Sequence, residues 1–143
     1  MDNGNAMKTF ILGIPVDRVN YDSALSRFES FLKGNKLSVI VTPNSEILYS
    51  ATKDDELKAV ITDADMVIPD GIGLVKASRI LGCPFEERVT GIDFTRKALD
   101  RLTALGGSVY FLGAKPGIAE KAAENLKTEI PGLNVAGTHD GYF

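Results

Sequence analysis

The sequence predicts an α/β protein in which helices cover a mostly parallel sheet. Short apolar runs rich in β-branched and aromatic residues alternate with longer segments whose apolar residues recur at helical spacing. Glycine, proline and small polar residues separate these segments. Strands that alternate with helices along a chain typically lie parallel in one sheet, which is a Rossmann-like arrangement.

The N-terminal half begins with a predicted strand or β-hairpin at residues 8–20, because strand-forming residues lie on both sides of Gly13. A helix follows at 21–35, with Asp22 as its N-cap and Gly34 as its end. The remaining segments are predicted to be a strand at 36–41, two short helices within 42–64 that break near Lys53, a strand at 65–69 and a helix at 71–82.

The C-terminal half continues the alternation. It is predicted to contain a helix at 93–107, a strand at 108–114, a helix at 116–132 that Pro116 opens and Pro131–Gly132 closes, and a strand from residue 133. No linker or low-complexity tract interrupts the pattern, so we predict one domain over residues 7–143. We interpret residues 1–6, "MDNGNA", as a remnant of cloning outside that domain.

Composition excludes several classes of protein. The 143 residues are 44% apolar and 24% charged, as in a soluble domain with a sizeable core. A net charge of -3 provides no basic field for the phosphates of a nucleic acid, so we expect no nucleic-acid partner. Cys83 is the single cysteine, so no internal disulfide forms. The sequence has no signal peptide and no apolar run of about 20 residues, and we expect a cytoplasmic protein.

Candidate functional residues follow the predicted strands, because parallel sheets bind ligands at the carboxyl ends of their strands. The segments that qualify are "TPNSE", "DGIG", "AKPG" and "THDGYF". Each has a structural alternative. Thr42 and Asn44 either bind a ligand or cap a helix, and Asp70 is either a catalytic carboxylate or the cap of the helix that follows it. The "GAKPG" segment either cradles a phosphate beside Lys115 or forms a tight turn.

Two other motifs are discounted. The "DAD" at Asp63–Asp65 resembles an acidic pair that holds a divalent cation, but it precedes a predicted strand and so lies at the opposite edge of the sheet. The "GIGLVK" segment begins like a dinucleotide-binding fingerprint, yet Lys76 occupies the third glycine position. The residues by themselves thus indicate an α/β domain that binds an anionic or nucleotide-linked ligand, with one exposed aspartate nearby.

A family resemblance extends this interpretation. The segments "VTPNSEIL", "ADMVIPDGIGLVKASRILG", "ERVTGIDF", "VYFLGAKPGIAEKAAENL" and "GYF" resemble, in order and spacing, those of the WecG/TagA/CpsF glycosyltransferase family. The resemblance covers residues 7–143 and is greatest to the TagA branch. It implies an inverting transfer of N-acetylmannosamine from UDP-N-acetylmannosamine to the 4-hydroxyl of N-acetylglucosamine on undecaprenyl diphosphate, a step in assembling the linkage unit of wall teichoic acid.

The resemblance also assigns roles to residues. Asp70 matches the aspartate expected to act as general base on the acceptor hydroxyl. Thr42 and Asn44 match a "T-x-N" motif that lines the sugar pocket.

A second motif of the family, "R-x-x-G-x-D", is matched by Arg88, Gly91 and Asp93. Its arginine is expected to meet a diphosphate, and its aspartate either bonds a hydroxyl or caps a helix. Gly113, Lys115 and Gly117 are expected to form the nucleotide side of the cleft.

Family members usually continue well past "GYF", so we expect this chain to lack a C-terminal part. That part is expected to supply arginines in place of a metal and a surface for the inner face of the cell membrane. We therefore expect no metal cofactor, a homo-oligomer and a peripheral membrane location. The competing hypothesis is a non-catalytic or oxidoreductase-like nucleotide-binding domain, in which Asp70 and Asn44 serve only as caps.

Overall fold

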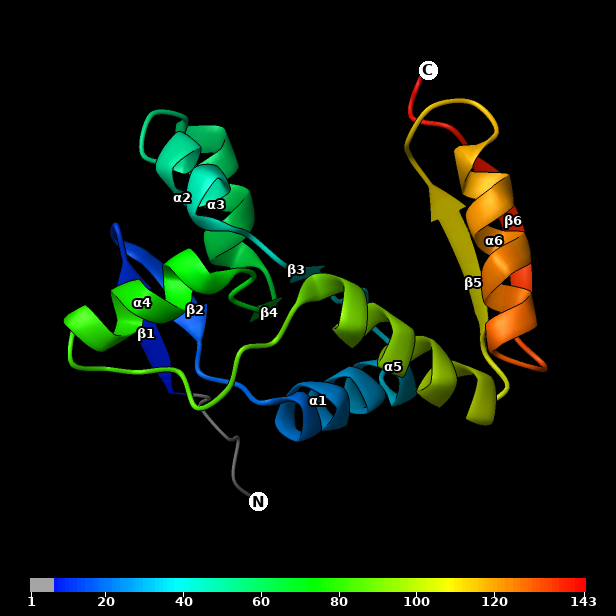
Figure 1. Ribbon diagram of the computed structural model, residues 1–143, viewed down its shortest axis with the longest axis horizontal. Helices are drawn as coiled ribbons and strands as arrows, with labels where there is room; N and C mark the ends of the chain where they lie inside the picture. Colours follow the sequence, from blue (N-terminus) through cyan, green and yellow to red (C-terminus); the bar gives the residue numbers. More distant parts are fainter. Residues whose placement is uncertain (1–6) are drawn as a thin grey trace. The chain divides into compact units, whose positions relative to one another are not determined.

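The computed structural model describes residues 7–143 and has the predicted α/β class (Figure 1). Its chain forms two compact units, of which the first ends at Phe94 and the second runs from Thr95 to Phe143. The single-domain assignment stays a prediction, and the interpretation of residues 1–6 lies outside the described residues.

The N-terminal hairpin is confirmed. Strand β1 (Lys8–Ile11) pairs antiparallel with β2 (Ile14–Asp17). The two residues between them, Leu12 and Gly13, have φ values of 52° and 76°. Positive φ at both central residues is the geometry of a tight hairpin turn whose twist matches that of the strands it joins.

The other strands form parallel pairs. In the first unit, β3 (Ile40–Val41) pairs with β4 (Met66–Val67), and in the second, β5 (Ser108–Leu112) pairs with β6 (Asn134–His139). Strands β3 and β4 are shorter than predicted, although the amides of Met66 and Ile68 extend their ladder by donating to the carbonyl oxygens of Val39 and Val41. The strands of the described residues form three two-stranded sheets instead of the one predicted sheet.

Within residues 7–143, six helices connect these strands: α1 (Tyr21–Lys33), α2 (Ser45–Ala51), α3 (Asp55–Asp63), α4 (Ile72–Ile80), α5 (Gly91–Ala104) and α6 (Ile118–Glu129). The predicted break near Lys53 separates α2 from α3. The prediction that Asp22 caps α1 is wrong. Asn20 is the cap, because it is extended and its side chain accepts from the amide of Ser23, whereas Asp22 lies inside the first turn. The predicted end at Gly34 is confirmed.

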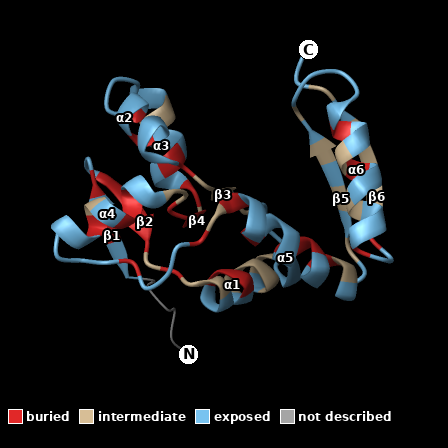
Figure 2. Cartoon of the chain, in the orientation of Figure 1, coloured by how far each residue is buried: buried red, intermediate tan, exposed pale blue. Residues whose placement is uncertain are grey.

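The core of the first unit joins the hairpin to α2, α3 and α4 (Figure 2). Its buried residues are Ile11, Ile14, Val16, Leu48, Ala51, Ile61, Ala64, Val67, Leu74, Val75 and Phe85. They come from both strands of the hairpin, from β4 and from those helices, except Ala64 and Phe85, which lie in connecting segments. The core thus joins segments that are far apart in the sequence.

A fully buried carboxylate lies beside this core. Asp17 Oδ1 forms an ion pair with Arg27 Nη1 at 3.0 Å, and Asp17 Oδ2 accepts from the amide of Val67 at 2.7 Å. The same guanidinium donates from Nη2 to the carbonyl oxygen of Asp65 at 2.6 Å. Asp17 and Arg27 therefore tie β2 and α1 to β4, a contact that sequence analysis missed because 50 residues separate Asp17 from Val67.

We predict that Asp17→Asn lowers the free energy of unfolding by about 3 kcal/mol, the lower end of the range for breaking a buried ion pair. The lower end applies because the Arg27 side chain is 27% exposed, so water can hydrate its guanidinium once the Asp17 charge is removed. Urea denaturation measures the change, with the exposed Asp22→Asn as a matched control. Equal stability of the two variants would contradict the role given to Asp17.

Candidate active site

The loops after β3 and β4 lie side by side. The amide of Asp70 donates to the carbonyl oxygen of Pro43 at 3.1 Å and so continues the parallel pairing beyond the strands. One turn further on, a methyl group on Gly73 would lie 2.9 Å from Ser45 Oγ, so the starts of α2 and α4 are in close contact. The structure therefore brings the "TPNSE" and "DGIG" segments together, as their positions after parallel strands predict.

The Asp70 carboxylate reaches the start of a third helix. Its Oδ2 accepts from the amide of Gly91, the first residue of α5, at 3.2 Å. The alternative that Asp70 caps α4 is wrong. The N-cap of α4 is Gly71, which has a φ of 95° and makes no side-chain cap, and Asp70 lies one residue before it. Asp70 is half-buried, and within residues 7–143 its Oδ1 has no hydrogen-bond partner.

Gly91 is packed against the two loops. It is buried, and a methyl group added to it would lie 2.9 Å from Thr42 Oγ1 and 3.0 Å from Asp70 Oδ2. Only glycine allows the start of α5 to come this close to both side chains. Thr42, Asp70 and Gly91 thus form one cluster in the first unit, which we call the Asp70 cluster.

Asn44 and Asp93 have structural partners at helix starts. Asn44 is the N-cap of α2, with its Oδ1 accepting from the amide of Ile47 at 2.9 Å. Asp93 lies in the first turn of α5, where its Oδ2 accepts from the hydroxyl of Thr90 at 2.7 Å. The capping role expected of Asn44 is confirmed, and this contact uses its oxygen and not the two donors of its amide nitrogen.

The segment before α5 is held by α1. The hydroxyl oxygen of Tyr21 accepts from the amide of Thr90 at 3.1 Å, and the Glu87 carboxylate accepts from the amide of Tyr21 at 3.0 Å. These contacts fix the stretch that carries the exposed Arg88 and leads into Gly91. Sequence analysis missed Tyr21 because no local pattern marks a contact across 69 residues.

The "DAD" motif lies at the amino ends of β3 and β4, as predicted. Asp65 Oδ2 accepts from the amide of Val39 at 2.9 Å, and its Oδ1 pairs with Lys36 Nζ at 3.2 Å. The backbone hydrogen bond from Val39 and the ammonium of Lys36 lower the pKa of Asp65. Its carboxylate therefore has partners within the chain.

In the second unit, the "GAKPG" segment forms a tight turn between β5 and α6. Ala114 has a φ of 64°, and Gly117, the N-cap of α6, has a φ of 84°. The carbonyl oxygen of Ala114 accepts from the amide of Gly141 at 2.9 Å, and the amide of Gly113 donates to the carbonyl oxygen of His139 at 2.9 Å. The turn alternative is confirmed, and a phosphate-binding role stays a prediction.

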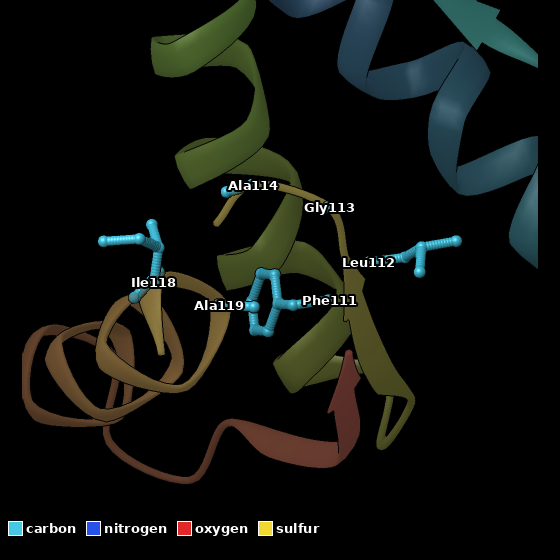
Figure 3. Close-up of a pocket in the computed structure, with 7 residues that line it drawn as sticks. Phe111, Leu112, Gly113, Ala114, Ile118 and Ala119 are labelled. Carbon is cyan, nitrogen blue, oxygen red and sulfur yellow. The ribbon is translucent and has the colours of Figure 1, made fainter. Parts of the chain in front are cut away.

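A pocket of about 230 Å³ opens beside this turn (Figure 3). It is lined by Phe111, Leu112, Gly113, Ala114, Ile118, Ala119 and Ala122. The Phe111 ring lies toward Ala119, whereas the Leu112 side chain extends to the other side of the strand (Figure 3). The lining is almost entirely apolar, so the pocket suits the face of a flat ring better than a charged group. Lys115 is exposed in the same turn.

The fold and the Asp70 cluster define an α/β protein with one anchored carboxylate at the carboxyl edge of a parallel strand pair. A sequence model of the "Glycosyl transferase WecG/TagA/CpsF family" matches residues 9–143. The chain therefore belongs to the WecG/TagA/CpsF family of glycosyltransferases, which confirms the resemblance.

Curated relatives point to one branch of this family. The N-acetylglucosaminyldiphosphoundecaprenol N-acetyl-beta-D-mannosaminyltransferase of Bacillus spizizenii W23 is 35% identical over 134 residues, which are 90% of this chain and 52% of the relative. Proteins of the same name in Bacillus subtilis 168 and Staphylococcus aureus NCTC 8325 are each 29% identical, over 92% and 99% of this chain and 52% and 56% of theirs. The chain thus spans about half the length of the curated relatives it matches.

A membrane-spanning helix is not found in the part of the chain that the structure describes, since its helices are too short or too polar.

If the full-length protein transfers a sugar with Asp70 as its base, we predict that Gly91→Ala lowers kcat by a larger factor than the factor by which it lowers the equilibrium constant for folding. The added methyl group must displace the Thr42 side chain or the Asp70 carboxylate, and overpacking of this kind costs about 1–3 kcal/mol. Thermal melting and the turnover number kcat are measured together, with the exposed Asp100→Ala on the same helix as a control. A Gly91→Ala protein with parental kcat would show that the close packing at Gly91 does not position the cluster.

Proposed function

We propose that the full-length protein is an inverting glycosyltransferase that moves N-acetylmannosamine from UDP-N-acetylmannosamine to the 4-hydroxyl of N-acetylglucosamine on undecaprenyl diphosphate. The family membership and the names of the relatives support the transfer and the lipid-linked acceptor. The observation that carries the mechanism is the Asp70 carboxylate, which has one anchored oxygen and one oxygen with no hydrogen-bond partner within residues 7–143.

This geometry suits a general base. The amide of Gly91 holds Oδ2 and fixes the orientation of the carboxylate, while Oδ1 is available to accept a proton. The acceptor oxygen attacks the anomeric carbon of the donor as its proton passes to Asp70. The bond from that carbon to the β-phosphate oxygen breaks, and UDP leaves with the electron pair. A single displacement from the opposite face inverts the anomeric carbon.

The remaining residues of the first unit position the sugars. We assign the Asn44 amide nitrogen to a sugar oxygen, because its Oδ1 is already used by the amide of Ile47. Thr42 belongs to the Asp70 cluster, and we assign it to the wall of the sugar pocket. Arg88 is exposed two residues before Thr90 and is assigned to a diphosphate, whose charge a guanidinium binds well. Asp93 is assigned to a sugar hydroxyl.

In the second unit, we assign the turn at Gly113, Lys115 and Gly117 to the nucleotide. The apolar pocket beside it offers the Phe111 ring and Ile118 to a uracil base, and the exposed Lys115 offers a cation to a phosphate. We further propose that the full-length protein acts as a homo-oligomer at the inner face of the membrane, where its lipid-linked acceptor lies, and contacts that surface through a C-terminal segment.

We predict that Asp70→Asn reduces kcat at least ~100-fold, the usual cost of losing a general base. The asparagine oxygen still accepts from the amide of Gly91, so melting and UDP binding stay near the parental values. Transfer is assayed on the full-length protein, with Asp63→Asn at the opposite edge of the strand pair as a matched control. Activity of Asp70→Asn within a few-fold of the parent would remove Asp70 from the chemistry.

We predict that transfer needs no divalent cation, because the "DAD" motif lies at the edge opposite Asp70 and its Asp65 is paired with Lys36. The transfer rate should be unchanged by excess EDTA. A loss of rate that manganese or magnesium restores would contradict this prediction and make Asp63 and Asp65 candidate ligands.

A further inference from the structure

Side-chain oxygens hold the start of α5. The first four amides of a helix have no partner within the helix, so other groups must accept from them. The hydroxyl oxygen of Tyr21 accepts from the amide of Thr90 at 3.1 Å, and Asp70 Oδ2 accepts from the next amide, that of Gly91. Thr90 Oγ1 in turn accepts from the amide of Asp93 at 3.3 Å. Tyr21 and Asp70 therefore bind adjacent amides of one helix start.

The bond to the Tyr21 hydroxyl is the main link between α1 and the segment before α5. Two other hydrogen bonds from the start of α1 end on the carboxylates of Glu86 and Glu87, and both are exposed. An exposed hydrogen bond contributes little, because water offers the same groups a replacement, whereas a buried amide without an acceptor is costly. The bond from the Thr90 amide to Tyr21 is partly buried. Its loss therefore affects this segment more than the loss of either exposed bond.

The position and the orientation of this backbone have different causes. The Val89 side chain is fully buried, which fixes where the backbone lies, but hydrophobic burial is non-directional. A hydrogen bond is directional, so the Tyr21 hydroxyl orients the Thr90 amide and, one residue on, the Gly91 amide. The Gly91 nitrogen lies 3.2 Å from Asp70 Oδ2, at the long end of the range for such bonds, so a small rotation is enough to break this contact.

Resting on the proposed function, we propose that Tyr21 is a positioning residue of the transfer. It acts through the start of α5: by holding the Thr90 amide, it keeps the Gly91 amide on Oδ2 of Asp70 and so keeps the carboxylate in one orientation. The other oxygen, Oδ1, then meets the acceptor hydroxyl from a fixed direction. Such control matters because displacement of a reacting group by about 1 Å can slow a reaction about 100-fold.

The test compares Tyr21→Phe with the parent in the full-length protein. Phenylalanine keeps the ring and removes the oxygen that accepts from Thr90. We expect kcat to fall about 10-fold, the order of one hydrogen bond that positions a reacting group, while KM for UDP-N-acetylmannosamine stays within about two-fold. A kcat close to that of the parent, or a change confined to KM, would overturn the proposal.

Thr9→Val is the matched control. The Thr9 hydroxyl donates to the carbonyl oxygen of Cys83 at 2.9 Å, so it also ties down the connection between α4 and α5, but near the end of α4. Each variant removes one hydroxyl from this connection, and a general loosening of the connection would lower kcat in both. We expect Thr9→Val to keep the parental kcat. An equal fall of kcat in the two variants would overturn the proposal.

A double-mutant cycle tests whether the effect passes through Asp70. Once Asp70→Asn has removed the base, the orientation of this side chain no longer limits the transfer. Adding Tyr21→Phe to Asp70→Asn should then change the residual kcat by less than about two-fold, because the two residues act as one unit. A further fall of about 10-fold would mean that Tyr21 acts elsewhere, for example on Arg88, and would overturn the proposal.

Failure of the proposed function is recognised separately. In that case the parent transfers no sugar, while amide hydrogen exchange followed by NMR still reports on the contact between α5 and Asp70. We expect the Gly91 amide to exchange about 10-fold faster in Tyr21→Phe than in the parent, and at the parental rate in Thr9→Val. Unchanged exchange at Gly91 in Tyr21→Phe would overturn the positioning role even if kcat falls.

Discussion

The first unit depends on one buried charge. Asp17 ends the hairpin and is fully buried, a position at which a carboxylate is costly unless it is paired and hydrogen-bonded. It has both kinds of partner, the guanidinium of Arg27 and the amide of Val67. Because these partners come from α1 and β4, a favourable place for Asp17 exists only when the hairpin, the helix and the strand are assembled together. The charge therefore selects one arrangement of these elements.

That arrangement determines where the Asp70 cluster lies. Val67 belongs to β4, and β4 is paired in parallel with β3, so the loops that leave both strands emerge at the same edge. Asp70 and Thr42 consequently lie near each other although 28 residues separate their positions in the sequence. At the opposite ends of the same strands, Asp65 ties the two strand entries together through Val39 and Lys36. The two acidic positions of this region thus differ: Asp65 is paired within the chain, and Asp70 is the proposed base.

The third member of the Asp70 cluster, Gly91, lies further along the chain. Gly91 reaches the Asp70 carboxylate because α1 holds the preceding segment through Tyr21 and because glycine has no side chain to block the approach. The helix start then offers a backbone amide to the carboxylate, and the favourable interaction of a negative charge with a helix N-terminus strengthens this contact. The family's "R-x-x-G-x-D" motif acquires a physical meaning here, since its glycine is the point of contact with the proposed base.

The sequence by itself determined the α/β class, the hairpin, the break between α2 and α3 and the family. These features rest on local signals: periodicity of apolar residues, glycine and proline at turns, and motifs in a fixed order. It also placed Thr42, Asn44 and Asp70 at one edge, since parallel strands direct their carboxyl ends alike.

Only the tertiary structure decided what the Asp70 side chain does. Local capping rules left it either a catalytic carboxylate or the cap of α4, but Gly71 is the N-cap of α4 and the Asp70 carboxylate binds the start of α5. The sequence also did not predict that Asp17 contacts Arg27 and Val67. Nor did it predict the hydrogen bond from the Thr90 amide to the Tyr21 hydroxyl. Each joins residues far apart in the chain, and the preference of a side chain for one distant partner over water depends on burial, which exists only once the chain has folded.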